Sequence, residues 1–261
     1  MAKFNCNFIS YTLMRTVDIT VIVPSVTIPE SMGMGAPEGE KPALSHCKAD
    51  KYPVLYLLHG FGNNHTAWNA YTNVELYAEE RNIAVVCISA ENKAYVNNER
   101  DAFYNFIAQE LPTFVCGMFP VSDRPEDTYI AGLSMGGYGT LVHALRRAEE
   151  FTAFGAFSAA TSFNGDAEAE PEKDPAKLLE QLVKEGRKIP KAYMACGSDD
   201  FLLQADIEFK DKLIAAGADV TWDQIDGYGH EWRFWDIQVE KFLKWIEPVR
   251  TDAYAGKLRK V

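Results

Sequence analysis

The chain has 261 residues, of which 47% are hydrophobic and 24% are charged, and its formal net charge is −11. This length and composition suit one α/β domain spanning residues 1–261 with a continuous core. The acidic balance argues against nucleic acid or an anionic membrane surface as the main partner, because both repel a negatively charged protein.

The N-terminus and the cysteines bear on the compartment in which the protein works. Residues 1–24 lack a basic segment followed by an unbroken apolar stretch and a cleavage site, so no signal peptide is expected. No run approaches ~18 apolar residues, so no membrane-spanning helix is expected either. The five cysteines are an odd number without CxxC spacing, which is typical of reduced thiols. These features predict a cytoplasmic protein.

Taken in chain order, the hydrophobic pattern begins with two strands, at residues 3–10 and 16–24. A stretch rich in Gly, Pro and Ser at residues 25–53 predicts a surface loop. Six strand–helix units follow. Their strands are expected at 54–60, 83–89, 128–134, 151–159, 191–197 and 220–225. Their helices are expected at 73–82, 101–119, 135–149, 175–186, 202–217 and 231–246.

Apolar strands that alternate with amphipathic helices predict a mainly parallel sheet with helices on both faces. Two leading strands and six units give about eight strands, which is the plan of an α/β-hydrolase. The acidic segment at about 163–175 is expected to be a solvated excursion above the sheet, and it is the one candidate for a lid.

The segment GLSMGG, residues 132–137, lies where a strand is expected to turn into a helix, and it fits the pattern G-x-S-x-G. Such a turn can simply require small residues. It can also be a nucleophile elbow, in which a strained serine projects above the sheet. Because the following helix directs free N–H groups at this point, an oxyanion would be stabilised there. We interpret Ser134 as a nucleophile.

A serine nucleophile needs a base and an orienting acid, which follow it in this fold in the order acid, then histidine. Of the five histidines, only His230 follows the later strands, in the glycine-flanked segment DGYGHEW. The acid is expected in SDDFLLQ, after the strand at 191–197, where Asp199 and Asp200 are both candidates. Asp226 lies on the loop of His230 itself and does not fit a separate-loop geometry.

The oxyanion needs two N–H donors, and the residue after the nucleophile, Met135, is expected to supply one. The second is expected from Phe61 in HGFGNN, where Gly60 and Gly62 let the backbone bend. His59 either orients this loop or only packs beneath it. HGFGNNH lacks further His or Asp ligands to complete a metal site, so neither a metal nor another cofactor is expected.

These segments together resemble the esterase D-like α/β-hydrolases, in the branch of the feruloyl, acetylxylan and tributyrin esterases. The resemblance covers nearly the whole chain and includes YLLHGFGNNHTAW, GLSMGGYGT, CGSDDFL and GYGHEWRFWD. It implies Ser134 as nucleophile, Asp200 as acid and His230 as base, with the Phe61 and Met135 N–H groups in the oxyanion hole. S-formylglutathione hydrolases share the architecture, but their oxyanion segment usually lacks this histidine–glycine pair.

The resemblance implies hydrolysis of short-chain acyl or hydroxycinnamoyl esters, some of them derived from plant carbohydrate, through an acyl-enzyme. The alternatives are an acyltransferase of the same fold, a thioesterase like S-formylglutathione hydrolase, and a binding module without activity. Trp68 and Trp232 either line the acyl pocket or pack in the core, whereas Trp235 belongs to an apolar helix face and is expected in the core. The expected partner is a small ester, and an oligomer is compatible with the sequence.

Overall fold

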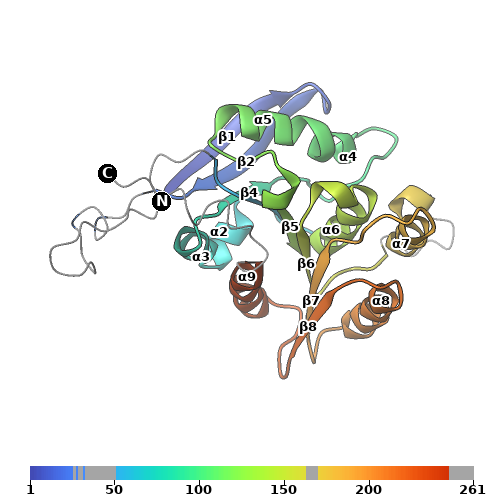
Figure 1. The fold of residues 1–261 in the computed structure, drawn as a ribbon. Coiled ribbons are helices and arrows are strands. Elements are labelled where there is room, and N and C mark those ends of the chain that lie inside the picture. The colour runs from blue at the N-terminus through green and yellow to red at the C-terminus, as the bar shows by residue number, and fades with distance from the viewer. Residues whose placement is uncertain (26–27, 29–31, 33–50, 163–169, 247–261) are drawn as a thin grey trace.

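The structure is a computed structural model that describes residues 1–25, 28, 32, 51–162 and 170–246 (Figure 1). The surface loop expected at residues 25–53 and the acidic excursion expected at 163–175 fall largely outside these ranges.

The described strands form one eight-stranded sheet in the order β1-β2-β4-β3-β5-β6-β7-β8. Its strands are β1 (Ala2–Ser10), β2 (Arg15–Val23), β3 (Val54–Leu58), β4 (Ala84–Ile88), β5 (Thr128–Leu133), β6 (Ala153–Phe157), β7 (Lys191–Gly197) and β8 (Val220–Ile225). β2 pairs antiparallel with β1 and with β4, and the remaining pairs are parallel. The structure therefore confirms the predicted α/β-hydrolase sheet, including its antiparallel leading strands.

Helices cover both faces of this sheet (Figure 1). They are α2 (Ala67–Tyr71), α3 (Val74–Glu80), α4 (Phe103–Asn105), α5 (Leu111–Met118), α6 (Met135–Arg146), α7 (Pro175–Lys184), α8 (Leu203–Ala215) and α9 (Trp232–Ile246). The core beneath α2, α3 and α9 is separate from the core beneath α5, α6, α7 and α8. The sheet is thus the middle layer of three.

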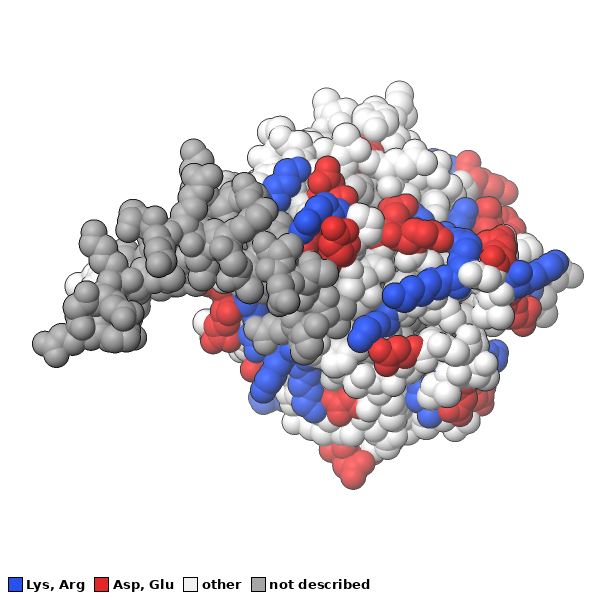
Figure 2. All heavy atoms as spheres, viewed as in Figure 1, with Lys and Arg blue, Asp and Glu red and all other residues white. Residues whose placement is uncertain are grey.

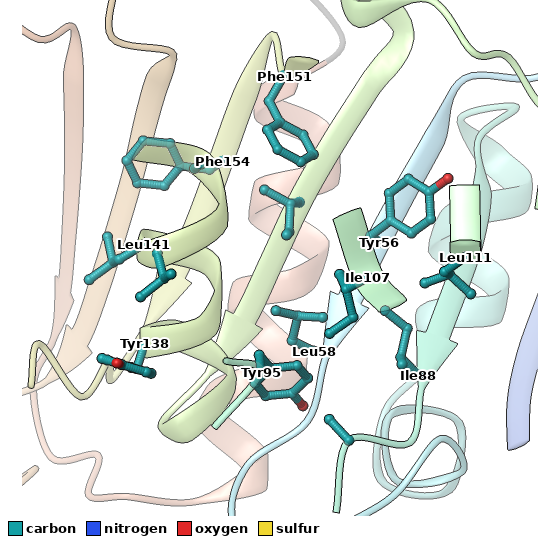
Figure 3. Packing of buried hydrophobic residues seen from close by; sticks show 14 of the residues in the cluster. Tyr56, Leu58, Ile88, Tyr95, Ile107, Leu111, Tyr138, Leu141, Phe151 and Phe154 are labelled. Carbon is teal, nitrogen blue, oxygen red and sulfur yellow. The ribbon is translucent and has the colours of Figure 1, made fainter. Parts of the chain in front are cut away.

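β3 shows how one apolar run serves both cores. All five of its residues are buried. Because successive side chains of a strand point to opposite faces, Tyr56 and Leu58 join the core under α5 and α6, while Leu55 and Leu57 join the core under α9. Figure 3 shows Tyr56 and Leu58 among the packed side chains of the first of these cores. A continuous apolar run is therefore what a central strand of a covered sheet requires.

The helix expected at 101–119 is interrupted by a π-helical turn at Phe106–Glu110. The cause lies in Pro112, which follows at the start of α5, since proline has no N–H and its ring clashes with the carbonyl four residues earlier. The turn places the Glu110 carboxylate against the hairpin between β1 and β2. There it accepts a hydrogen bond from the Ser10 hydroxyl (2.7 Å) and two from backbone N–H groups.

The surface carries charges of both signs, and Figure 2 shows acidic and basic side chains interspersed over one face. No helix within the described ranges has the length and apolar character needed to span a membrane.

Strand register brings several loops to one edge of the sheet. Leu58 of β3 pairs with Gly132 of β5, and Leu133 pairs with Phe157 of β6. Gly197 of β7 pairs in turn with Ile225 of β8. The residues after these strands therefore meet at the carboxyl edge, where chemistry gathers in sheets of this kind.

Candidate active site

Ser134 lies between β5 and α6 with φ 53° and ψ −117°, a conformation that L-residues rarely adopt. Backbone hydrogen bonds hold it there. Its N–H donates to the carbonyl of Phe157 (3.0 Å), and its own carbonyl accepts from the N–H groups of Tyr138 (3.0 Å) and Ala160 (3.1 Å). This backbone is strained and fixed from both sides, which is the conformation predicted for a nucleophile elbow.

Two of the glycines in the motif are required by close backbone contacts. A Cβ atom on Gly132 would lie 2.4 Å from the carbonyl oxygen of Gly136. One on Gly136 would lie 2.4 Å from the carbonyl oxygen of Leu58, at the end of β3. Because these neighbours are backbone atoms, they have no rotamer by which to move away. The glycines therefore let α6 begin directly against the ends of β5 and β3.

The acid and the base lie on two different loops, and their side chains contact each other. His230 Nδ1 lies 2.9 Å from Asp200 Oδ2, and the Asp200 side chain has no exposed surface. Asp200 Oδ1 accepts from the N–H of Leu202 (2.9 Å). Asp199 is exposed and bonds instead to the neighbouring Ser198 hydroxyl (2.9 Å). Of the candidate acids, the structure brings Asp200 to His230.

The charge state of Asp200 follows from its surroundings. Burial alone raises the pKa of its carboxyl, but the hydrogen bonds from His230 and the Leu202 N–H oppose this effect, and the pKa lies below its ordinary value. Asp200 is therefore an anion at neutral pH. Since a carboxylate only accepts, Nδ1 of His230 carries the proton of their shared hydrogen bond and Nε2 is free to act as a base.

Backbone contacts fasten the two loops that carry this pair. The N–H of Asp199 donates to the carbonyl of Tyr228 (3.0 Å), and the N–H of Gly227 donates to the Ser198 hydroxyl (2.8 Å). At Gly197, a Cβ would lie 2.1 Å from the Tyr228 carbonyl oxygen, so only glycine permits this approach.

Two aromatic rings enclose the imidazole of His230. Trp235 meets it edge-on at 4.9 Å and Phe201 meets it at 4.7 Å, measured between ring centroids. Trp235 is buried, as expected, whereas 77% of Phe201 is exposed. The imidazole therefore has a fixed inner wall and an outer wall that faces solvent.

The two expected oxyanion donors lie beside the elbow. Met135 is the first residue of α6, and Phe61 follows Gly60, whose Cβ position lies 3.6 Å from that of Ser134. Within the described residues, neither N–H has a hydrogen-bond partner. Both N–H groups are therefore available as donors close to Ser134.

His59 orients the Phe61 peptide, which decides between the two roles left open for it. The N–H of Ala90 donates to His59 Nε2 (3.1 Å), so Nδ1 carries the proton and donates to the carbonyl of Gly60 (2.7 Å). The Gly60 carbonyl and the Phe61 N–H belong to one trans peptide and point in opposite directions. Burial lowers the pKa of His59 to about 4, which keeps this tautomer neutral.

Trp68 and Trp232 differ in exposure. Trp68 is completely buried and its indole N–H donates to the carbonyl of Leu58 (3.0 Å), so it packs in the core and is not an open pocket wall. Trp232 is half-buried and stacks on the exposed ring of Tyr71, with centroids 4.9 Å apart. The ring of Trp232 also meets the rings of Trp68 and Trp235 edge-on.

Three residues in or around the site carry no signal in the sequence. Phe201 lies within the segment that supplied the acid, but an exposed phenylalanine there could not be placed beside His230 from sequence. Ser158 comes next to Trp235, and Tyr71 next to Trp232, only through the fold. Among the described residues, no group of three or more His, Cys, Asp or Glu side chains is placed to hold a metal ion.

Comparison with known proteins gives relatives over nearly the whole chain. The model of a family described as "Putative esterase" matches residues 42–245. An acetyl esterase of Caldicellulosiruptor saccharolyticus is 30% identical over 276 residues, which cover 95% of this chain and 99% of that protein.

Two solved structures from Staphylococcus aureus are also similar. One is FphF, a fluorophosphonate-binding serine hydrolase, with 27% identity, a TM-score of 0.81 and coverage of 94% of this chain and 98% of that one. The other is an S-formylglutathione hydrolase, with 27% identity, a TM-score of 0.79 and the same coverage.

Proposed function

The chain belongs to the esterase family whose model it matches over residues 42–245, and we propose that it cleaves small carboxylic esters through an acyl-enzyme on Ser134. The enzyme class, a carboxylic ester hydrolase, follows from the family and the acetyl esterase relative. The observation that carries the mechanism is the hydrogen bond between Asp200 and His230, at the edge of the sheet where strained Ser134 lies.

In the first half-reaction, Ser134 Oγ attacks the ester carbonyl carbon while His230 Nε2 takes the hydroxyl proton. The carbonyl π electrons move to oxygen, and the resulting oxyanion accepts hydrogen bonds from the Phe61 and Met135 N–H groups. Asp200 stabilises the imidazolium. The tetrahedral intermediate then expels the alcohol, which leaves with the proton from His230.

In the second half-reaction, a water molecule gives a proton to His230 Nε2 and attacks the acyl carbon. The oxyanion forms again on the same two donors. Its collapse breaks the bond to Ser134 Oγ, which recovers its proton from His230, and the carboxylic acid is released. No cofactor enters either half-reaction.

The proposed substrates are short acyl esters, with hydroxycinnamoyl esters as the larger members. The acetyl esterase relative supports a short acyl group. Two exposed aromatic rings beside the site, those of Phe61 and Phe201, support a planar acyl group, because such rings stack on planar ligands. The half-buried Trp232, which stacks on the exposed ring of Tyr71, contacts Trp235, the ring that packs on His230.

A thioesterase is the second candidate, favoured by the likeness to the S-formylglutathione hydrolase. Both reactions would use the same nucleophile and differ in the leaving group. A cytoplasmic setting is also proposed, and the free state of the four described cysteines supports it.

Steady-state kcat/KM for acetate, butyrate, palmitate and ferulate esters and for an S-acyl glutathione tests the substrate class. We expect the acetate or butyrate ester to be the best substrate and palmitate to be poor. A preference for palmitate would refute the short-acyl proposal, inertness toward ferulate esters would remove the hydroxycinnamoyl part, and a dominant thioester would favour the second candidate. Product analysis with added acceptor alcohols separates hydrolysis from acyl transfer.

Labelling with a fluorophosphonate probe tests the nucleophile independently of substrate. We expect one label per chain, on Ser134, and none in Ser134→Ala. A folded wild-type protein that hydrolyses esters without labelling at Ser134 would contradict the acyl-enzyme on this residue.

A further inference from the structure

Tyr95, in the loop after β4, has a strained backbone that no sequence motif explains. It is fully buried and has φ 64°, in the left-handed region that a bulky residue rarely adopts. Ala94 before it has φ 52°. Such a conformation persists only where tertiary contacts hold it, and it is most often found at functional sites. The contacts of Tyr95 therefore indicate what this loop does.

The hydroxyl of Tyr95 contacts the loop that carries one of the expected oxyanion donors. It donates to the carbonyl of His59 (2.7 Å), and the rings of the two residues lie 5.7 Å apart. Burial raises the pKa of this hydroxyl well above its ordinary value, so it stays protonated and able to donate. The same carbonyl lies against the first turn of α6, where a Cβ on Gly136 would come within 2.7 Å of its oxygen.

Two further hydrogen bonds hold the loop of Phe61. Nδ1 of His59 donates to the Gly60 carbonyl, as described above. The N–H of Gly62 donates to the side-chain oxygen of Asn92 (2.7 Å), which lies in the loop after β4 together with Tyr95. The three successive peptides between His59 and Gly62 are thus each held by a hydrogen bond, and the N–H of Phe61 belongs to the middle one.

Tyr95 is itself held by α6, the helix that begins at Met135. His143 Nε2 lies 2.9 Å from the Tyr95 carbonyl oxygen, and because a carbonyl only accepts, this nitrogen carries the proton. The Tyr95 ring packs on Gly139, where a Cβ would lie 2.5 Å from a ring carbon. Figure 3 shows this ring in the core under α6. The helix that supplies the Met135 N–H therefore also holds the residue that fixes the loop of the other donor.

We infer that Tyr95 and Asn92 are positioning residues for the proposed oxyanion hole, which fix the loop of the Phe61 donor. Tyr95 fixes this loop against α6, and Asn92 fixes it from the exposed side. The inference rests on the function proposed above and deepens that site. Donors stabilise a transition state only when they are in place before the reaction, so the position of the loop relative to α6 determines how well the hole works.

Tyr95→Phe tests the buried contact, because it removes one oxygen and keeps the ring that packs on α6. We expect kcat for an acetate ester to fall roughly ten-fold with little change in KM, since a displaced donor weakens binding of the transition state alone. Rates are expressed per active site, counted by fluorophosphonate labelling, so that unfolded enzyme does not contribute.

Asn92→Ala tests the exposed contact. Asn92 lies at the surface, and its variant loses the hydrogen bond from the Gly62 N–H. We expect a smaller loss of kcat, about three-fold, again with little change in KM, because a single hydrogen bond of the loop is lost while the Tyr95 contact remains.

Trifluoroacetone measures the oxyanion hole directly. Ser134 Oγ adds to its carbonyl carbon, the serine proton passes to His230, and the former carbonyl oxygen becomes an oxyanion that faces the two donors. We expect its inhibition constant to rise in each variant by the factor by which kcat/KM falls, because the adduct resembles the transition state. A merely structural role would lower the number of active sites without this parallel change.

Tyr193→Phe is the matched control. Tyr193 is also a buried tyrosine, and its hydroxyl bonds to side-chain oxygens of Asp223 (3.1 Å) and Gln238 (2.8 Å), but it lies in β7 and packs in the core under α9. We expect this variant to be less stable than wild type, with a wild-type kcat and a wild-type inhibition constant for trifluoroacetone.

A wild-type kcat in Tyr95→Phe, or a lowered kcat with an unchanged inhibition constant, would overturn the inference, as would an equal loss in Tyr193→Phe. If Tyr95→Phe gives no folded enzyme, Asn92→Ala decides alone, and wild-type values there overturn the inference. Fluorophosphonate labelling of wild type separates these failures from a failure of the proposed function. If wild type labels on Ser134, only the inference about the loop after β4 is wrong, and if it does not, the proposed nucleophile itself is wrong.

Discussion

Ser134 is held almost entirely by backbone contacts. Asp200 and His230 lie on two loops that are also fastened by backbone contacts, but their side chains are oriented by each other and by neighbouring rings. At the nucleophile turn, three backbone hydrogen bonds and two close glycine contacts fix the chain. At the acid–base pair, one carboxylate–imidazole hydrogen bond and two aromatic rings determine the geometry. We call the first arrangement a backbone lock and the second a side-chain lock. Both use residues from several elements, but the backbone lock requires glycines close to Ser134 in the sequence, whereas the side-chain lock depends on which side chains the fold brings together.

The largest expected effect follows because the nucleophile and the base act in the same reaction step. Ser134→Ala and His230→Ala should each lower kcat by roughly 10⁵–10⁶-fold, and the double variant should be hardly worse than either, because nucleophile and base act as a unit. Steady-state kinetics on an acetate ester measures this. Multiplicative losses in the double variant would show that His230 acts independently of Ser134.

The next largest effect tests the contact between the side chains of Asp200 and His230. Asp200→Asn should lower kcat by about 10³–10⁴-fold, since an amide can present its N–H to Nδ1 and favour the wrong imidazole tautomer. Asp199→Asn is the matched control. Asp199 is the exposed neighbour in the same loop and does not bond His230, so its variant should stay within about two-fold of wild type. The reverse ranking would move the acid to Asp199.

The contrast between the two regions explains what the sequence could predict. Strand–helix alternation predicted the eight strands because each buried strand is a short apolar run. The elbow was visible because its glycines lie within five residues of one another. Asp199 and Asp200 could not be separated by sequence alone, since the choice depends on which side chain reaches an imidazole thirty residues away. Ser158 carries no signal because its hydrogen-bond partners, Ala195 and Trp235, come from β7 and α9.

The roles of the two candidate pocket tryptophans likewise could not be assigned from the sequence alone. Trp68 and Trp232 are both near the site in the fold, but burial separates them, and burial is a property of packing between α2 and α9. The π-helical turn at Phe106–Glu110 was also missed, although Pro112 was visible in the sequence. A proline indicates that the helix backbone is perturbed near it, but the sequence does not show which backbone geometry results.

A smaller effect tests the backbone lock. Gly136→Ala should destabilise the protein by about 3 kcal/mol, because its Cβ meets two backbone carbonyls that can move only with their strand. Gly229→Ala, in the loop of His230, is the matched control, since its Cβ would lie 3.8 Å from its nearest neighbour. Urea unfolding measures both. Equal stability of the two variants would contradict a nucleophile turn locked by close packing.

The last effect is spread over a pH range and concerns His59, whose side chain orients the peptide that carries the Phe61 N–H. Burial lowers its pKa from 6.5 to about 4, so between these values the unfolded chain binds more protons than the folded one. Its contribution to stability is therefore complete above pH 6.5 and is lost as the pH falls toward 4. The slope from one such group is at most about 1.4 kcal/mol per pH unit.

His59→Asn isolates that contribution, because an asparagine amide can still donate to the Gly60 carbonyl but does not titrate. Urea unfolding at pH steps from 7 to 4 should show a shallower loss of stability in the variant than in wild type. His143 is fully buried and its pKa is also lowered, and it remains in both proteins, so the difference between the two curves reports His59. Parallel curves would mean that folding does not lower the pKa of His59, which would contradict a buried imidazole that stays neutral below pH 6.5.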